Sequence, residues 1–280
     1  MKQLYYIALA IILLCNIDQT AAQSKSDMPN VKIPKGFVFI EGGNYQLTPD
    51  AIVPIRSFFM SSTEVSNLEY RTFLADLKRN GTEEEYAKAS IVVDTFDTLN
   101  HFAIFQIYAE NPAYDDYPVV NVTRAGIDLY CAYLNKMIGQ DKKSEYQIRA
   151  RLPSAIEWEF AATGGVPKKK YPWDGNSLTD SKGRQRACYH TSNDSITTFM
   201  SPVKSFEKTD NGLYNIIGNV AEMTNEIFDV VKGGSWHAQD GQLFIQNNDY
   251  LKFRGVQSSP AIGFRPIISI YPKSILKIEN

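Results

Sequence analysis

The sequence is poor in the side chains that bind transition metals. Its 280 residues include three cysteines and three histidines, at positions 15, 131, 188 and at 101, 190, 237 respectively. No two histidines lie within four residues of each other, so no pair can share one face of a helix as metal ligands. The sequence therefore predicts satisfied or solvent-facing histidines rather than a helical pair of metal ligands.

The chain also lacks a strong charge and the common catalytic motifs. Its net charge is −2 and its pI is about 6.0, so nothing favours nucleic acid or an anionic membrane as a partner. It contains no Gly-x-Ser-x-Gly elbow, and its Gly-Gly pairs do not follow a phosphate-binding pattern. Asp115 and Asp116 are adjacent carboxylates in an extended segment before Pro118, where we expect them to shape a turn rather than share a proton.

The first residues have the layout of a secretory signal peptide. One lysine precedes an apolar run too short to span a bilayer comfortably, and small residues precede a cleavage point before Gln23. We expect a signal peptide over 1–22, a polar tether over 23–32, and an exported protein that is periplasmic or associated with the outer membrane. Lipidation of Cys15 is a weaker alternative, because the bulky Leu14 precedes it.

Local patterns predict three helices. Ser66 with Glu69, and Ser154 with Glu157, have the spacing of capping boxes, and Gly81 and Gly164-Gly165 are suitable stops. The remaining helix is expected over about 123–138. Gly42-Gly43 interrupts a strand-like run and predicts a hairpin, whereas residues 83–118 have a weak pattern typical of a surface insertion.

These elements predict one α+β domain that is irregular and rich in loops, over residues 33–272, with a C-terminal tail over 273–280. Cys131 and Cys188 could pair in an oxidising compartment or remain buried thiols. Because Cys131 shares a helix face with Ile127 and Leu134, we favour a buried thiol there.

Eight blocks in a fixed order carry a resemblance to a known family. They include "FVFIEGG", "RLPSAIEWEFAATGG", "GLYNIIGNVAEMT", "VKGGSW" and "GFRPI", and they span about residues 36–268. The chain resembles the formylglycine-generating-enzyme, or sulfatase-modifying-factor, domain family. Within it, the chain is most similar to gliding-motility and type IX secretion lipoproteins of the GldJ/GldK type. The resemblance implies a variant of the C-type-lectin-like fold.

The same resemblance implies that this chain lacks the copper site of the family's enzymes. The family's enzymes oxidise a substrate cysteine with copper held by two thiolates, which lie between the Gly-Gly-Ser and Gly-Phe-Arg blocks. Here that interval, 236–262, contains no cysteine, and hydroxyls or amides cannot replace thiolates as copper ligands. We therefore expect no formylglycine-generating activity, no catalytic residue, and neither copper nor iron as cofactor.

The resemblance further implies a structural calcium ion at the "GNVAE" block. Asn219 and Glu222 would be its side-chain ligands, and Gly218 and Val220 would contribute carbonyls, since calcium takes six to eight oxygens. The open alternative is that Glu222 accepts hydrogen bonds from buried backbone or pairs with Arg265. The chain departs from the family at Met223 and Arg124, and Cys188 stands where an asparagine often helps to hold a second calcium.

The predicted function is that of an envelope scaffold that binds protein partners, in or beside a type IX secretion or gliding apparatus. Its 16 Tyr and 15 Phe residues permit a large contact surface. Arg151, Glu157, Glu159 and Arg265 are expected to anchor packing rather than to react. Two alternatives stay open: a metal-dependent oxidase or oxygenase with an unrecognised site, and a lectin-like module for glycans or peptides.

Overall fold

The computed structural model describes residues 32–92, 107–139, 143–191, 199–226, 230–246 and 258–276. The predicted signal peptide, the tether up to residue 31, Cys15 and His101 lie outside these residues. None of the helices in the described ranges is long and apolar enough to cross a membrane.

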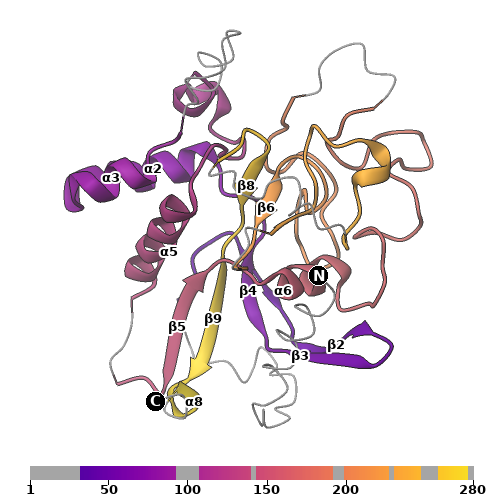
Figure 1. The fold of residues 1–280 in the computed structure, drawn as a ribbon, viewed down its shortest axis with the longest axis horizontal. Helices are drawn as coiled ribbons and strands as arrows, with labels where there is room; N and C mark the ends of the chain where they lie inside the picture. The colour runs from indigo at the N-terminus through magenta and orange to yellow at the C-terminus, as the bar shows by residue number, and fades with distance from the viewer. Residues whose placement is uncertain are drawn as a thin grey trace, which may run out of the picture.

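A four-stranded antiparallel sheet runs through the middle of the molecule (Figure 1). Its strand order is β1-β4-β9-β5, with bounds Phe37–Ile40, Phe58–Ser61, Ile267–Pro272 and Tyr146–Arg151. Every residue of β4 and the first four of β9 are buried. Because successive side chains point to opposite faces of a strand, these two strands supply core residues to both sides of the sheet.

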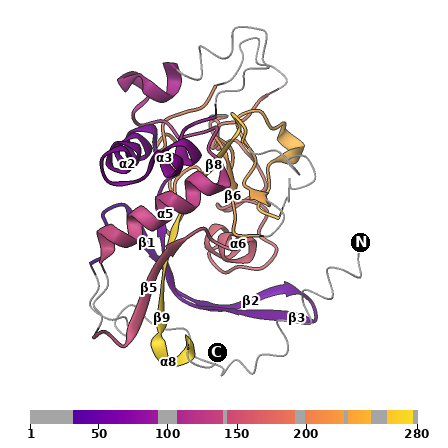
Figure 2. The ribbon, with the colours of Figure 1, turned by 60° about the vertical axis from the view of Figure 1, so that its left-hand side comes forward.

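Helices α2, α3 and α5 lie on one side of this sheet, and α6 lies on the other (Figures 1 and 2). Their bounds are Asn67–Asn80, Glu83–Ala89, Arg124–Ile138 and Ala155–Thr163. Tyr70 of α2 and Tyr130 of α5 pack with Ile268 in one core cluster. Trp158 and Phe160 of α6 pack with Ile267 in a second cluster. The central sheet therefore separates two hydrophobic cores.

The three predicted helices are confirmed with their caps. Ser66 and Ser154 form capping boxes with Glu69 and Glu157, so side chains satisfy N–H groups that the first turns leave unpaired. Thr123 caps α5. Helix α6 ends at Gly164, whose φ of 65° is left-handed and suits a residue without a Cβ.

The predicted hairpin at Gly42-Gly43 is wrong. Strand β1 pairs with β4, whereas β2, Gly43–Thr48, pairs with β3, Ala51–Ile55, in a separate ribbon. The two glycines instead carry the chain from one sheet to the other. The Gly42 N–H donates to the Ser57 Oγ at 2.9 Å, and a Cβ on Gly42 would lie 2.3 Å from the Ile55 carbonyl oxygen.

The predicted surface insertion over 83–118 contains more structure than expected. Helix α3 has its own capping box, in which Thr82 and Glu85 exchange hydrogen bonds, and a short 3-10 helix, η2, covers Pro112–Tyr114. Asp115 closes that turn and pairs with Arg71 of α2. The sequence pattern does not reveal α3, because its first residues are charged and only Ala89 of this helix is buried.

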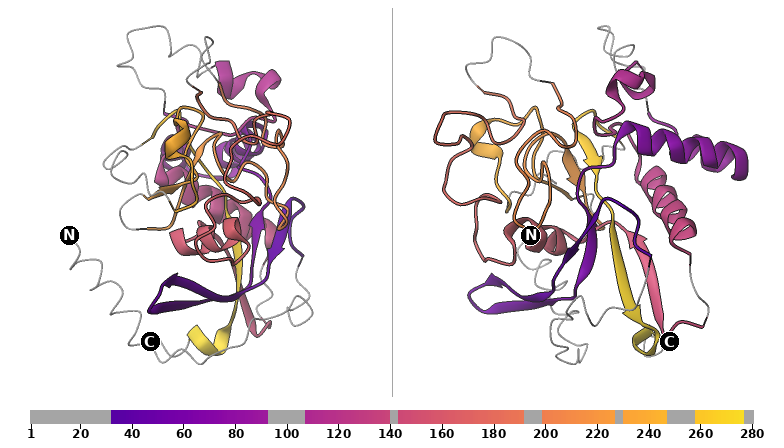
Figure 3. Two further views of the ribbon diagram at one scale, coloured as in Figure 1. Left: turned by 90° about the vertical axis from the view of Figure 1, so that its right-hand side faces the viewer. Right: turned by 180° about the vertical axis from the view of Figure 1, so that it is seen from behind.

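After α6 the described chain is mostly turns, as expected. The regular pieces are a small sheet of order β7-β6-β8, with bounds Val231–Lys232, Ala221–Met223 and Ile262–Phe264, and the 3-10 helix η3, Asp240–Gln242. Strand β9 is followed by α8, Lys273–Leu276. Figure 3 shows the long connections of this half lying together beside the central sheet. The mixed, loop-rich α+β fold is confirmed.

Candidate functional site

A fully buried group of charges joins three distant parts of the chain. Glu64 lies between β4 and α2, Glu222 lies in the middle of β6, and Arg265 follows β8. All three residues are at most 1% exposed. We call these three residues the Arg265 centre. Because charges this deep must be compensated by partners, the contacts of the centre decide what it can do.

The Arg265 guanidinium is held on every side. Its Nε donates to both carboxylate oxygens of Glu222 at 3.0 Å, and its Nη2 donates to the Glu222 Oε1 at 2.7 Å. Its remaining bonds reach backbone carbonyls, from Nη1 to Ser61 at 3.0 Å and from Nη2 to Tyr214 at 2.8 Å. Arg265 therefore joins the end of β4, the turn before β6 and β6 itself.

Glu222 has a third donor from the opposite core. The indole Nε1–H of Trp158 in α6 donates to the Glu222 Oε2 at 2.7 Å. The carboxylate thus accepts hydrogen bonds from a guanidinium and an indole while it sits between β7 and β8. This arrangement is the alternative in which Glu222 pairs with Arg265.

Glu64 receives amide donors rather than a strong ion pair. The Asn219 Nδ2 donates to the Glu64 Oε1 at 2.9 Å, and the Asn215 Nδ2 lies 3.4 Å from the Oε2. The nearest guanidinium nitrogen of Arg265 is 3.9 Å away. Burial raises the pKa of Glu64 to about 8, although the positive charge of Arg265 opposes that shift. Burial of Glu64 therefore favours its neutral acid, while the Arg265 guanidinium is compensated mainly by Glu222.

The turn from Asn215 to Asn219 places these amides. Asn215 and Asn219 have φ values of 48° and 59°, a left-handed conformation that asparagine tolerates better than most residues. Gly218 has a φ of 78°, and a Cβ there would lie 2.3 Å from the Cys188 carbonyl oxygen. The "NIIGN" stretch is thus a tight turn that packs directly against the chain at Cys188.

A second buried ion pair lies beside the Arg265 centre. The Lys232 Nζ of β7 is 2.6 Å from the Glu159 Oε1 of α6, and the lysine also lies 5.8 Å from the centroid of the Trp158 ring. Arg151 holds Glu157 through two bonds of 2.7 and 2.8 Å. Burial favours the neutral acid of Glu157, but Arg151 outweighs burial and lowers its pKa. The expected packing roles of Arg151, Glu157, Glu159 and Arg265 agree with these contacts.

The residues predicted for calcium are already engaged with protein groups. The Asn219 Oδ1 accepts from the Ser201 N–H at 2.8 Å, while Glu222 faces Arg265 and Trp158. Gly218 and Val220 are buried in the same turn. In this arrangement the two side chains offer no free oxygens to a common ion, and Arg265 supplies the positive charge. Calcium at this block remains a prediction that would require these bonds to be exchanged.

The thiols and the described histidines lie apart. Cys131 packs in the core between α2 and α5, where burial raises its pKa to about 12. Cys188 donates to the Phe199 carbonyl at 3.2 Å, and both cysteines are free and buried. His190 pairs its backbone with Gln239, and His237 is exposed beside Trp236. The described residues contain no cluster of three or more histidine, cysteine or acidic side chains able to hold a metal ion.

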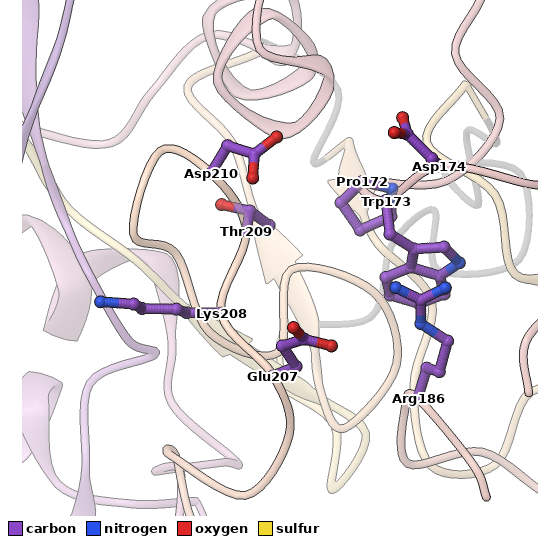
Figure 4. A pocket seen from close by; sticks show the side chains of 8 residues that line it. All are labelled: Pro172, Trp173, Asp174, Arg186, Glu207, Lys208, Thr209 and Asp210. Carbon is purple, nitrogen blue, oxygen red and sulfur yellow. The ribbon is translucent and has the colours of Figure 1, made fainter. Parts of the chain in front are cut away.

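The outer surface near the loops carries an open, charged pocket of ≈390 Å³ (Figure 4). The Arg186 guanidinium lies 4.5 Å from the centroid of the Trp173 ring, and Tyr171 stacks on the same indole at 5.6 Å. The Trp173 indole is therefore packed against both a guanidinium and a second aromatic ring. The rest of the lining is mostly charged and includes Asp174, Glu207, Lys208 and Asp210.

The comparisons with known proteins agree with this architecture. The model of the sulfatase-modifying factor enzyme 1-like domain matches residues 20–270. The chain belongs to this family. Among curated relatives, this sulfatase-modifying-factor domain is 27% identical over 249 residues to the formylglycine-generating enzyme of Thermomonospora curvata, covering 75% of this chain and 76% of that protein.

Two further comparisons bear on the family. The domain is 26% identical over 242 residues to the inactive C-alpha-formylglycine-generating enzyme 2 of Bos taurus, covering 71% of this chain and 75% of that protein. The structure of PvdO from Pseudomonas aeruginosa superposes with a TM-score of 0.58 at 21% identity, covering 83% of this chain and 94% of the other. At that identity the likeness shows the fold alone. The family thus includes a relative named as an enzyme and a relative named as inactive.

Proposed function

We propose that this sulfatase-modifying-factor domain is a non-catalytic member of its family that binds protein partners. The observation that carries the proposal is the composition of the interval 236–262, which contains no cysteine. The two thiols elsewhere in the domain lie in different core regions, Cys131 in α5 and Cys188 in the loop against Phe199. Neither is available to a thiolate pair of the kind that binds copper.

The charged residues support a structural role for the interior. Glu222, Glu159 and Glu157 each accept hydrogen bonds from a buried or half-buried cation. A catalytic acid or base must touch its substrate, and Glu222 and Arg265 are at most 1% exposed. The interior charges therefore fix the fold, and the activity of the domain belongs to its surface. The relative named as inactive is a precedent for a member of the family without the reaction.

We further propose that the domain is exported and acts in the cell envelope as a scaffold, related to the GldJ/GldK type of gliding-motility and type IX secretion lipoproteins. The signal-peptide layout of residues 1–22 and the order of the sequence blocks support this proposal. The charged pocket around Trp173 offers a recognition surface, since an indole with a stacked arginine is typical of protein contacts.

Crosslinking in the native envelope tests the scaffold role. The tagged chain is crosslinked in intact cells, purified, and its partners are identified by mass spectrometry. The expected result is a small set of envelope proteins whose recovery falls when Trp173→Ala and Arg186→Ala are combined. A matched control, Arg184→Ala, changes an exposed arginine two residues away that is bonded to Asp180. Recovery of the chain alone in both forms would contradict the scaffold role.

A further inference from the structure

A second pocket lies between the central sheet and the start of α2. It has a volume of ≈260 Å³, and its polar lining consists of Lys35, Ser61, Ser62, Thr63, Glu69, Tyr130 and Lys204. Its apolar lining comes from Phe37, Val65 and Pro266. We call it the Tyr130 pocket. It combines a charged entrance with a floor of hydroxyl groups, because Lys35 and Lys204 are exposed whereas the three hydroxyl residues 61–63 are buried.

The floor of the pocket is rigid because its backbone is fully engaged. The Ser61 N–H donates to the Pro266 carbonyl at 3.0 Å, and the Ser62 N–H donates to the Gly36 carbonyl at 2.7 Å. The Ser61 carbonyl accepts from Arg265, and the Ser62 carbonyl accepts from the Tyr214 N–H at 2.8 Å. These bonds fix residues 61 and 62 while leaving their side-chain hydroxyls free for another partner.

The Tyr130 hydroxyl is the unusual feature of this pocket. Tyr130 is only 5% exposed. Its ring packs against the rings of Tyr70, Phe73 and Phe264. Among the described residues its hydroxyl has no hydrogen-bond partner, and its oxygen is not one of the fully enclosed unpaired atoms, so it stays open to the pocket. Because Tyr130 lines the pocket, the missing partner is expected there.

The charges of the lining select an anion with a single charge. Lys35 and Lys204 contribute two positive charges, and Glu69 contributes one negative charge. The Glu69 carboxylate already accepts from the Ser66 N–H at 2.8 Å as the capping box of α2. Glu69 repels a dianion such as phosphate more strongly than a singly charged carboxylate, which can accept from the lysine and hydroxyl donors together. The apolar wall suits a short hydrocarbon stem attached to it.

From this arrangement we propose that the Tyr130 pocket binds a carboxylate on a small apolar stem, with the Tyr130 hydroxyl, the serine and threonine hydroxyls and the two lysines as donors. This inference is independent of the proposed scaffold function, since it concerns a different surface. A free small acid and the C-terminal carboxylate of a polypeptide present the same chemistry to these donors.

Calorimetric titration of the purified full chain with 3-phenylpropionate, and with its uncharged amide, tests the proposal. We expect the acid to bind and the amide to bind about tenfold more weakly or worse, because charge-assisted hydrogen bonds are lost. Binding of the acid and the amide with equal affinity would overturn the proposal. So would preferential binding of inorganic phosphate.

Three variants locate the binding. Lys204→Met and Tyr130→Phe each remove one donor and are expected to weaken binding of the acid at least about fivefold, while Tyr130→Phe keeps the ring in the core. The control Lys208→Met removes an exposed lysine that lines the Trp173 pocket instead. Chemical denaturation confirms that each variant is folded. An equal loss with Lys208→Met would place the acid elsewhere and overturn the assignment.

A free tetrapeptide ending in phenylalanine and its C-terminal amide distinguish the two sources. Tighter binding of the free peptide than of 3-phenylpropionate supports the proposal and identifies a polypeptide C-terminus as the ligand. The reverse order also supports it and identifies a small free acid. Equal affinity of the peptide and its amide, together with failure of 3-phenylpropionate to bind, would contradict any carboxylate site.

Discussion

At the scale of single residues, Arg265 connects the most distant parts of the molecule. Its bonds reach Glu222 on β6, the Ser61 carbonyl at the end of β4 and the Tyr214 carbonyl before the "NIIGN" turn. A buried pair of this kind contributes little compared with apolar packing, but breaking it leaves a charge without compensation. The stability of the domain therefore depends on keeping both partners.

Replacement of Arg265 tests this dependence. We expect Arg265→Met to lower the free energy of unfolding by about 3–5 kcal/mol, because the Glu222 carboxylate would be left buried and unpaired. Urea denaturation followed by tryptophan fluorescence measures the change. The control Arg184→Met removes an exposed arginine that pairs with Asp180 and should leave the unfolding midpoint unchanged. A similar loss of unfolding free energy in both variants would show that stability does not depend on the buried Arg265–Glu222 pair.

The pH dependence of stability tests the protonation of Glu64. Its pKa is about 8 in the folded chain, because burial raises it from the ordinary value of 4.5. Between these two pKa values, Glu64 is protonated in the folded chain and ionised in the unfolded chain. The contribution of Glu64 to the free energy of unfolding therefore falls as the pH rises from about 4.5 to 8. We expect Glu64→Gln to reduce this slope, with urea midpoints measured at several pH values.

The glutamine oxygen can keep the hydrogen bond from the Asn219 Nδ2, while its own amide group takes the place of the oxygen that faces Asn215. The Asn215 Oδ1 has no partner in the described structure and becomes an acceptor for the new amide if the Asn215 side chain rotates. An identical slope in the wild type and in Glu64→Gln would show that Glu64 titrates normally in the folded chain.

Sequence patterns predict some residues of this centre and not others. Glu222 and Arg265 stand in recognisable blocks, and their pairing is one of two expected outcomes. Glu64 is missed because "STEVSN" precedes a helix, where an acidic residue is ordinarily solvated. Nothing local indicates that this carboxylate is completely buried, since its partners come from residues about 150 positions away.

At the scale of elements, the sequence predicts what depends on neighbours along the chain. The capping boxes at Ser66 and Ser154 and the start of α5 at Thr123 are confirmed because capping is local. The hairpin at Gly42-Gly43 is wrong because strand pairing is not local. Strand β1 has a better partner in β4, which is buried along its whole length between β1 and β9.

The close approach at Gly42 has a measurable consequence. A Cβ at this position would lie within 2.7 Å of three backbone atoms, from Ile55, Arg56 and Ser57, which cannot rotate away as a side chain could. We expect Gly42→Ala to lower the free energy of unfolding by about 1–3 kcal/mol, the usual cost of overpacking. The control Gly241→Ala has nothing within 4 Å of its Cβ and should be neutral. Equal stability of the two variants would contradict the crowding.

The "NIIGN" turn and β6 carry a related prediction about calcium. Because Arg265 supplies the positive charge beside Glu222, we expect removal of calcium with EGTA to leave the melting temperature unchanged. Differential scanning calorimetry with and without added calcium measures this. A melting temperature that falls with EGTA and recovers with calcium would show that the predicted ion exchanges with these bonds.

At the scale of the whole molecule, the shared fold does not by itself establish the reaction of the relatives. The domain keeps the α+β architecture of its family, with a TM-score of 0.58 to PvdO, while its interval 236–262 holds no thiol. Sequence blocks predict the fold because their order matches the family over most of the chain. They predict neither the partner nor the Tyr130 pocket, since the pocket is assembled from residues that are far apart in the sequence.

The proposal that this sulfatase-modifying-factor domain does not oxidise cysteine is tested most directly by an activity assay. The purified chain is supplied with copper and a cysteine peptide that the Thermomonospora curvata enzyme converts, with that enzyme as positive control, and the products are analysed by mass spectrometry. We expect an unchanged thiol in the presence of this chain, because thiolate ligands are missing from the interval 236–262. Conversion of the thiol to an aldehyde, at a rate that depends on the amount of chain added, would contradict it.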